Sequence, residues 1–419
     1  MHTSTHLYAA GSNGSGQLAT GDFQDAHNFI LCTFAGYKCS TSYPVTSSVI
    51  TTIVGGGNHT LALLSISSDK RLQVWGCGDG TKGQLGPAYM TEAGDNSAIF
   101  RPIILPLEEQ GLPGYAVSKV AACWETTFFV LTKEGRHDVL ISMGGDDFGD
   151  LGVGGLGTKQ QRKTTFHIID FSHIVGSAAR HVSIDNIAGG PHHAILVLRV
   201  DNKQHIVGWG AARHGQLGSL LAPSGRPLPY SPSPVAIDLP IDVQLDPVLS
   251  VRAGNQHSLF LHTSGHVSAL GSDAKGQLHG LHATGDVRAI NCSWNGSYLR
   301  TPTALLSTGA NAHGQLGRTD APAVPLGVVD IPANAQVLDF ACGSEHALCL
   351  LESDGRKQVW GWGWNEHGNL GTGLLDDVVV PVKIWPPSTA KSEEIAGDAI
   401  GVWAGCGTSW VAVSKRDPL

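Results

Sequence analysis

Histidine and cysteine are the residues of this chain that could bind a metal ion or take part in catalysis. The 419-residue sequence contains 20 His and 8 Cys, but it has no His-Glu-x-x-His segment and no Cys-x-x-Cys pair. Zinc sites depend on such spacings because their ligands must converge on one ion. The Gly-x-Ser-x-Gly segment that exposes a nucleophilic serine is also missing from the sequence. The sequence therefore predicts no catalytic residue, no metal site and no cofactor.

Four histidines recur at one position of a short repeated segment, and this recurrence indicates packing rather than chemistry. The segment, here called the His segment, has its fullest form in Gly254-Asn-Gln-His257-Ser258 and occurs seven times. Its His position is occupied by His59, Thr126, His193, His257, Gly296, His346 and Thr408. A catalytic group could not vary in this way within one chain, whereas a packing group can. We therefore expect the four histidines to be structural and to bond the backbone of a neighbouring repeat.

A second repeated segment, here called the Gly segment, alternates with the first and also occurs seven times. It consists of a Gly, four residues, a second Gly, then Gln, Asp or Asn, then Leu. Its second glycines are Gly16, Gly83, Gly149, Gly215, Gly276, Gly314 and Gly368. Successive copies lie 38 to 67 residues apart, a period that suits one blade of several strands. Glycine is expected there because it tolerates a positive φ and close backbone approach in tight turns.

Short apolar runs flank both segments and predict strands. Residues 128–131 and 195–198 are examples, and runs of this length bounded by glycine turns are typical of buried strands. The chain starts with a Gly segment and ends with a His segment, so we expect residues 6–10 to complete the final blade and remove two open sheet edges. Only 17 residues separate Gly276 from Ser293, which predicts a shortened fifth blade.

These repeats predict an all-β fold, a seven-bladed β-propeller closed by pairing of the N-terminal strand with the C-terminal blade. We expect a single domain over residues 1–419, with repeats from about 6 to 413. The long connectors 22–48, 87–117, 152–183 and 219–248 carry no clear function in the sequence.

Net charge and hydropathy restrict the function classes. The formal net charge is −8, which opposes broad binding to the phosphate backbone of nucleic acid. No apolar run approaches the roughly 18 residues of a membrane span. The N-terminal residues Met-His-Thr-Ser-Thr-His lack the charged and apolar regions of a secretory signal. We expect a cytoplasmic protein with access to the nucleus.

Two segments carry a resemblance to a known family. Residues 361–371 (Gly-Trp-Gly-Trp-Asn-Glu-His-Gly-Asn-Leu-Gly) and 7–18 (Leu-Tyr-Ala-Ala-Gly-Ser-Asn-Gly-Ser-Gly-Gln-Leu) resemble repeats of the regulator of chromosome condensation family. That resemblance implies a seven-bladed propeller. The immediate start of the repeats and the acidic charge are similar to the fungal alpha-tubulin-suppressor proteins of this family.

Variable positions of the repeats are the candidate partner-binding site. Trp124 and Trp294 lie between the Gly and His positions of the His segment, where other copies carry polar residues, and Trp364 lies at a variable place of the last Gly segment. Variable loops on a rigid scaffold commonly bind partners, and Trp is frequent among interface anchors. Core packing is the alternative for these side chains. The predicted partner-binding residues are Trp124, Glu125, Trp294, Asn295, Glu345, Trp364 and Glu366.

Three function hypotheses follow. The resemblance to the alpha-tubulin-suppressor proteins implies a non-catalytic accessory factor that forms a heterodimer with a small metal-binding, zinc-finger-like protein of the diphthamide pathway. Such a pair supports Elongator-dependent modification of wobble uridines in transfer RNA and diphthamide synthesis. The second hypothesis is a guanine-nucleotide exchange factor for a small GTPase. The third is a tryptophan-based light sensor, although only two of the seven variable pairs contain Trp.

Overall fold

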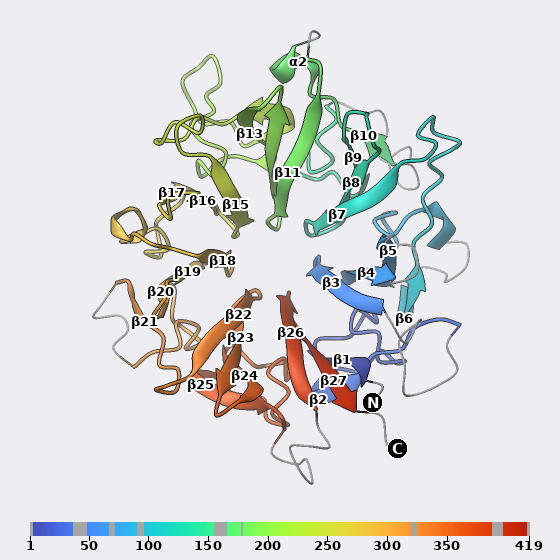
Figure 1. The fold of residues 1–419 in the computed structure, drawn as a ribbon. Helices are drawn as coiled ribbons and strands as arrows, with labels where there is room; N and C mark the ends of the chain where they lie inside the picture. Colours follow the sequence, from blue (N-terminus) through green and yellow to red (C-terminus); the bar gives the residue numbers. More distant parts are fainter. Residues whose placement is uncertain are drawn as a thin grey trace. The chain divides into compact units, whose positions relative to one another are not determined.

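The described part of the chain divides into two compact units. The computed structural model describes residues 3–36, 48–66, 72–89, 96–154, 166–176, 179–319, 325–387 and 397–416. Unit 1 comprises Met1–Asp79, Glu92–Ile103 and Ala310–Leu419, and unit 2 comprises Gly80–Thr91 and Ile104–Gly309. Both units are built from antiparallel strands (Figure 1). No helix within the described residues is long and apolar enough to cross a membrane.

Unit 1 contains three four-stranded sheets. Their strands, in order across each sheet, are β2 (Ala26–Leu31), β1 (Thr3–Gly11), β27 (Thr408–Arg416) and β26 (Asp398–Gly405); β3 (Ser48–Gly55), β4 (His59–Ile66), β5 (Leu72–Asp79) and β6 (Asn96–Pro102); and β22 (Gln336–Cys342), β23 (His346–Ser353), β24 (Arg356–Gly363) and β25 (Val378–Trp385). The short strand β21 (Gly327–Val328) also belongs to unit 1.

The described residues of unit 2 form four further groups of strands and short helices. The strands are β7 (Ala116–Ala122), β8 (Thr126–Thr132), β9 (Val139–Gly144) and β10 (His167–Ile168); β11 (Val182–Gly189), β12 (His193–Val200), β13 (Lys203–Ala211) and β14 (Tyr230–Ala236); β15 (Val248–Ala253), β16 (His257–His262) and β17 (Val267–Gly271); and β18 (Ala289–Cys292), β19 (Gly296–Arg300) and β20 (Leu305–Gly309). The helices are α2 (Ser172–Val175) and η1 (Leu281–Ala283).

The strand that follows each His segment is the buried strand of its sheet. Almost every residue of β8, β12 and β16 is buried, because their continuous apolar sequences are covered on both faces. One core cluster joins the sheet of β7–β10 to that of β11–β14, and another joins β11–β14 to β15–β17. The predicted buried strands at 128–131 and 195–198 are therefore confirmed.

The pairing of the N-terminal strand with the last blade is also confirmed. Strand β1 pairs antiparallel with β27 along its whole length, from Thr3 opposite Arg416 to Gly11 opposite Thr408 (Figure 1). In this sheet β1 has β2 on its other side and β27 has β26. Neither β1 nor β27 is left as an open edge.

The shortened fifth blade appears as a sheet of three strands. Strands β15, β16 and β17 have no fourth partner among the described residues. After β17 the chain forms η1, whose Leu281 is buried, and continues directly into β18. The short interval between Gly276 and Ser293 leaves no room for both an outer strand and its turns.

The second glycines of all seven Gly segments have a positive φ, as the sequence predicts. Their φ values lie between +72° and +85°. Close approach adds a second requirement at some of them, since a Cβ on Gly149 would lie 2.5 Å from the Cα of Pro232. A side chain at this position would be strained by its backbone and would also collide with β14.

The sequence predicts that the repeated histidines bond the backbone of a neighbouring repeat, and the structure adds contacts to hydroxyl groups of the neighbouring sheets. His193 Nε2 lies 3.0 Å from Ser258 Oγ, and His257 Nε2 lies 3.1 Å from Ser297 Oγ. Ser258 Oγ donates its own hydrogen to the carbonyl of Gln216 at 2.8 Å. The serine therefore accepts from the imidazole, which places the histidine proton on Nε2.

Two of these histidines also explain the glycine three residues before them. A Cβ on Gly254 would lie 2.1 Å from Cε1 of His257, and one on Gly343 would lie 2.2 Å from Cε1 of His346. Where the His position holds Thr126, the Gly position holds Cys123. The side chains at the two positions thus compete for the same space. Burial also removes water from the imidazoles, and this desolvation lowers their pKa to about 4 in His59, His257 and His346 and to about 3 in His193.

Candidate functional site

Two of the predicted site residues, Trp124 and Trp294, form an aromatic contact in unit 2. Trp124 lies between β7 and β8, and Trp294 lies between β18 and β19. Their ring centroids are 5.9 Å apart, with the planes inclined at 46°. Both side chains are only partly buried. Neither is a core residue of its blade, because the core positions of unit 2 are filled by other side chains such as Trp209.

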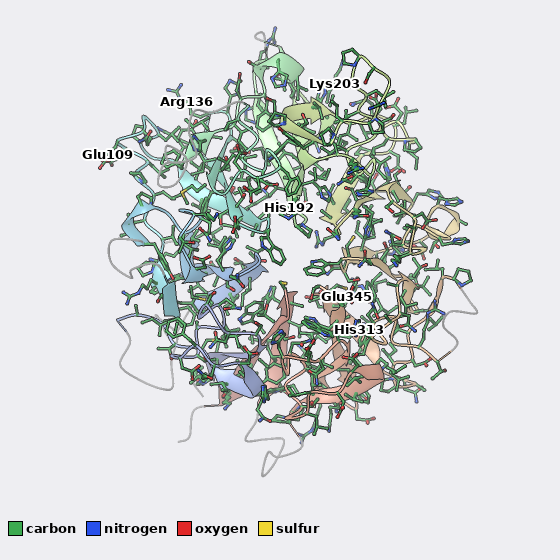
Figure 2. All side chains as sticks on the ribbon, turned by 180° about the vertical axis from the view of Figure 1, so that it is seen from behind. Glu109, Arg136, His192, Lys203, His313 and Glu345 are labelled. Carbon is green, nitrogen blue, oxygen red and sulfur yellow. The ribbon has the colours of Figure 1, made fainter. Side chains whose placement is uncertain are left out.

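His192 and Phe148 extend this aromatic contact. The His192 ring lies 6.4 Å from that of Trp124 and 4.5 Å from that of Phe148, and Phe148 is 41% exposed. Figure 2 labels His192. We name Trp124, Trp294, His192 and Phe148 the aromatic surface of unit 2. His192 and Phe148 were not identified from the sequence as parts of it.

A buried carboxyl group lies behind the aromatic surface. Asp150 Oδ2 is 3.6 Å from His192 Nδ1, and its side chain is 6% exposed. Burial raises the pKa of the Asp150 carboxyl, and the neighbouring His192 opposes that shift only in part. The backbone carbonyl of Asp150 also accepts the indole N–H of Trp209 at 2.9 Å. The aromatic surface therefore rests on a rigid part of the blade.

Variable positions of the two repeated segments meet in pairs, which the sequence analysis missed. In three copies, the residue before the second Gly of a Gly segment contacts the residue before the His position of the next His segment. Lys82 Nζ lies 3.6 Å from Glu125 Oε2, and His313 Nε2 lies 3.4 Å from Glu345 Oε2 (Figure 2). Phe148 and His192 occupy the same two positions. Opposite charges at these positions were the signal in the sequence.

The predicted site residues of unit 1 lie among histidine–aspartate contacts. Besides Glu345, His313 contacts Asp377, with Nδ1 and Oδ2 2.7 Å apart. The ring of Trp364 meets the ring of His367 edge-on at 5.3 Å. Trp364 is half-buried. The sequence grouped Trp364 with Trp124 and Trp294, whereas the structure places it in unit 1.

The remaining predicted residues have simple positions. Glu366 is exposed at the tip of its Gly segment, and Asn295 is half-buried next to Trp294. In the described part of the chain, no group of three or more His, Cys, Asp and Glu could hold a metal ion. The predicted site residues of both units thus contribute aromatic contacts and ion pairs.

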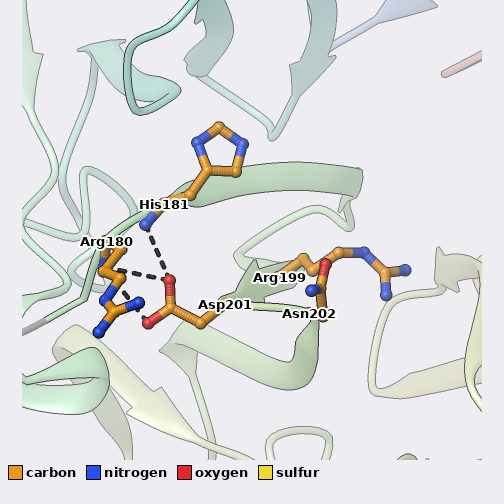
Figure 3. A pocket seen from close by; sticks show the side chains of 5 residues that line it. All are labelled: Arg180, His181, Arg199, Asp201 and Asn202. Carbon is orange, nitrogen blue, oxygen red and sulfur yellow. Dashed lines mark hydrogen bonds between the residues drawn. The ribbon is translucent and has the colours of Figure 1, made fainter.

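A hollow at the turn between β12 and β13 is held together by its own polar groups. Arg180, His181, Arg199, Asp201 and Asn202 line it (Figure 3). Asp201 accepts hydrogen bonds from the backbone N–H groups of His181 at 2.9 Å and Arg180 at 3.1 Å, and these bonds lower the pKa of its carboxyl. Arg199 is paired with Asp185. These contacts fix the turn and give the hollow a structural role.

Comparison with known proteins identifies the repeats. Residues 337–369 and 357–409 match the sequence profile described as the regulator of chromosome condensation (RCC1) repeat. Residues 337–409 are thus similar to the RCC1 repeat. The resemblance that the sequence shows at 361–371 lies inside these matches.

Relatives and a solved structure extend the likeness over nearly the whole chain. The chain is 25% identical to the "Secretion-regulating guanine nucleotide exchange factor" of Bos taurus, over 97% of this chain and 82% of that protein. It is 25% identical to "RCC1 repeat-containing protein C10F6.04" of Schizosaccharomyces pombe, over 98% of this chain and 99% of that protein. The crystal structure of Prp20p from Saccharomyces cerevisiae superposes with a TM-score of 0.71 at 18% identity, covering 99% of this chain and 92% of that chain. The fold is thus all-β, a seven-bladed β-propeller, as predicted.

Proposed function

We propose that this protein is a non-catalytic docking factor that binds a partner protein through the aromatic surface of unit 2. The observation that carries the proposal is the half-buried contact between Trp124 and Trp294 at 5.9 Å. Large aromatic side chains at loop positions, outside the blade core, supply apolar area at a low cost in conformational entropy. Trp124 packs against His192, which in turn contacts the buried Asp150.

For the partner, we propose a small, zinc-finger-like metal-binding protein of the diphthamide pathway. The support is the sequence resemblance to the fungal alpha-tubulin-suppressor proteins. In this proposal the heterodimer acts in the cytoplasm and nucleus, in Elongator-dependent modification of transfer RNA and in diphthamide synthesis. The propeller contributes no chemistry and controls access to the partner's metal.

A small GTPase is the second candidate partner. The relative from Bos taurus is named a guanine nucleotide exchange factor and matches 97% of this chain. An exchange factor accelerates nucleotide release by binding, without covalent steps, and a docking surface on a propeller suits that role. The tryptophan-based light sensor is a third hypothesis, for which the Trp124–Trp294 contact is the relevant feature.

The decisive experiment compares candidate partners with the purified full-length chain. Calorimetry with the zinc-finger-like protein and nucleotide-release kinetics with a panel of small GTPases separate the first two hypotheses. Binding of the zinc-finger-like protein with no acceleration of nucleotide release supports the first one. Acceleration for one GTPase favours the second. A reversible change of near-ultraviolet absorbance or oligomeric state on irradiation favours the third.

The aromatic surface itself is tested with the double variant Trp124→Ala/Trp294→Ala. Tyr230→Ala is a matched control, because Tyr230 is an exposed aromatic residue of unit 2 on β14. The double variant should lose affinity for whichever partner binds, while the control retains it. Equal affinity of both variants would contradict the proposed surface.

A further inference from the structure

We propose that unit 1 carries a second docking surface, formed by residues 20–25 and 372–377, for a segment of a partner protein that is both basic and apolar. We call these two segments the paired loops. The proposal goes beyond the docking function of unit 2, because it depends on different residues in a different compact unit.

The paired loops are two copies of one structure. Asn13 N–H donates to Asp25 Oδ1 at 2.8 Å, and Asn365 N–H donates to Asp377 Oδ1 at 3.0 Å. In both cases the Asp follows the Asn by 12 residues. Each loop begins with Thr-Gly, continues through three further residues and ends with Asp. Two Gly segments of unit 1 therefore continue into the same rigid turn.

Two contacts made by residues in or next to the loops join the loops to one another. Asp25 Oδ2 lies 2.6 Å from His367 Nδ1, in the Gly segment from which the second loop continues. The N–H of Gly373 donates to the carbonyl of His27 at 2.8 Å, immediately after the first loop. These contacts hold the two loops on one continuous surface.

That surface exposes large apolar side chains. Phe23 is 46% exposed, and Leu375, at the equivalent position of the other loop, is 48% exposed. Leu374 and Val379 are exposed by 62% and 53%. Single exposed apolar residues are common on protein surfaces, but three on joined rigid loops, with Val379 two residues beyond the second loop, are typical of an interaction site.

The surroundings of these side chains are acidic. Segments 3–31 and 358–382, which contain both loops, have no Lys or Arg. Their five carboxylates are Asp22, Asp25, Glu366, Asp376 and Asp377. Asp25 and Asp377 fix the loops, while Asp22, Glu366 and Asp376 lie exposed around the apolar residues.

Charge complementarity identifies the occupant. The apolar residues of such a partner segment would cover Phe23 and Leu375. Its Lys or Arg side chains would lie opposite the carboxylates of the paired loops, and this attraction favours fast association. Nucleic acid would be repelled by these carboxylates. A second copy of this chain, docked through the same surface, would oppose carboxylate to carboxylate. The partner segment is therefore basic and belongs to another protein.

The test uses a fluorescein-labelled synthetic peptide that combines Lys, Arg and Leu, and a matched peptide in which Glu replaces every Lys and Arg. Fluorescence anisotropy with the full-length chain should show saturable binding of the basic peptide, weakened by added salt, and no binding of the acidic one. Loss of affinity with salt is expected because the carboxylates remain partly exposed to solvent. Failure of the basic peptide to bind, or equal binding of both peptides, overturns the proposal.

Two variants assign the binding to the paired loops. Phe23→Ser/Leu375→Ser should weaken the basic peptide by about tenfold, and Glu366→Gln/Asp376→Asn should weaken it by about threefold while reducing its salt dependence. Leu245→Ser is the control, since Leu245 is an exposed apolar residue of unit 2. If both loop variants bind the basic peptide with an affinity within about twofold of the wild type, the assignment to the paired loops is overturned.

Two further measurements separate this surface from the alternatives. Trp124→Ala/Trp294→Ala should leave the peptide affinity unchanged, so failure of the docking function of unit 2 would not affect this result. Sedimentation should show that the wild-type chain does not dimerise through the paired loops. A dimer formed through them would be abolished by Phe23→Ser/Leu375→Ser. Such a dimer would overturn the proposed partner in favour of self-association.

Discussion

The aromatic surface of unit 2 and the paired loops of unit 1 use the same repeated segments to present different chemistry. In unit 2 the variable positions carry Trp124, Trp294 and Phe148, and Lys82 is paired with Glu125. In unit 1 the corresponding region is acidic and its histidines are held by Asp25 and Asp377. The difference teaches that the repeats preserve the scaffold while the variable tips change in charge and aromatic content.

The first prediction tests the shared scaffold and has the largest expected effect. Gly254→Ala should destabilise the protein by about 3 kcal/mol, because the new methyl group would lie 2.1 Å from Cε1 of His257. In a His257→Thr background the cost should fall by more than half, since Cys123 and Thr126 show that a side chain and Thr coexist at these positions. Urea unfolding of the four proteins measures this coupling. Equal costs in both backgrounds would show that the two positions do not share one volume.

Acid should weaken both units through the same buried histidines. The pKa of His257 and His346 is about 4 in the folded protein and 6.5 as the ordinary value. The unfolded chain therefore binds more protons below pH 6.5, so stability is fully present above that pH and falls as pH decreases. Below pH 6.5, each such histidine should lower the free energy of unfolding by roughly 1.4 kcal/mol per pH unit, until the pH reaches its pKa in the folded protein.

Urea unfolding followed by tryptophan fluorescence at pH 7, 6 and 5 checks this slope. His257→Thr should reduce the slope by the contribution of one proton relative to wild type. A variant with an unchanged slope would show that this imidazole does not remain neutral in the folded protein.

The aromatic surface should dominate partner binding by unit 2. Trp124→Ala/Trp294→Ala should cost about 2 to 4 kcal/mol of binding free energy, because buried aromatic anchors carry much of an interface's affinity. Calorimetry with the identified partner measures the loss. Trp364→Ala sharpens the comparison, since Trp364 belongs to unit 1 and should have little effect on the same partner. If it weakens binding equally, the three tryptophans act on one partner, as the sequence alone indicates.

The histidine–aspartate contacts of unit 1 should have the smallest effect on stability. His367 and Asp25 are 39% and 32% exposed, so solvent screens their attraction. A double-mutant cycle with His367→Ala and Asp25→Ala should give a coupling energy of about 0.5 to 1 kcal/mol. Thermal unfolding measures it. A coupling energy near zero would show that the contact does not hold the paired loops.

Much of the fold could be predicted from the sequence because it repeats. Seven copies of two segments defined the strands, the shortened fifth blade and the pairing of β1 with β27. The positive φ of the second glycines followed from the same pattern. In each case the information is local, and each copy supports the others.

The contacts that the sequence did not reveal are those between distant segments. The hydroxyl of Ser258 as partner of His193 depends on how two blades pack. Asp25 and His367 are 342 positions apart in the chain. His192 and Phe148 looked like unrelated residues because their repeat positions vary in type. Such contacts depend on three-dimensional packing that residue spacing does not encode.

The pairing of β1 with β27 has a consequence for synthesis on the ribosome. Strand β27 is translated long after β1, so β1 must wait for the residues between them to emerge before its hydrogen bonds to β27 can form. During that interval β1 has an unsatisfied edge that could capture other nascent chains. Slow translation would prolong this exposure, and a chaperone that shields extended segments would shorten it.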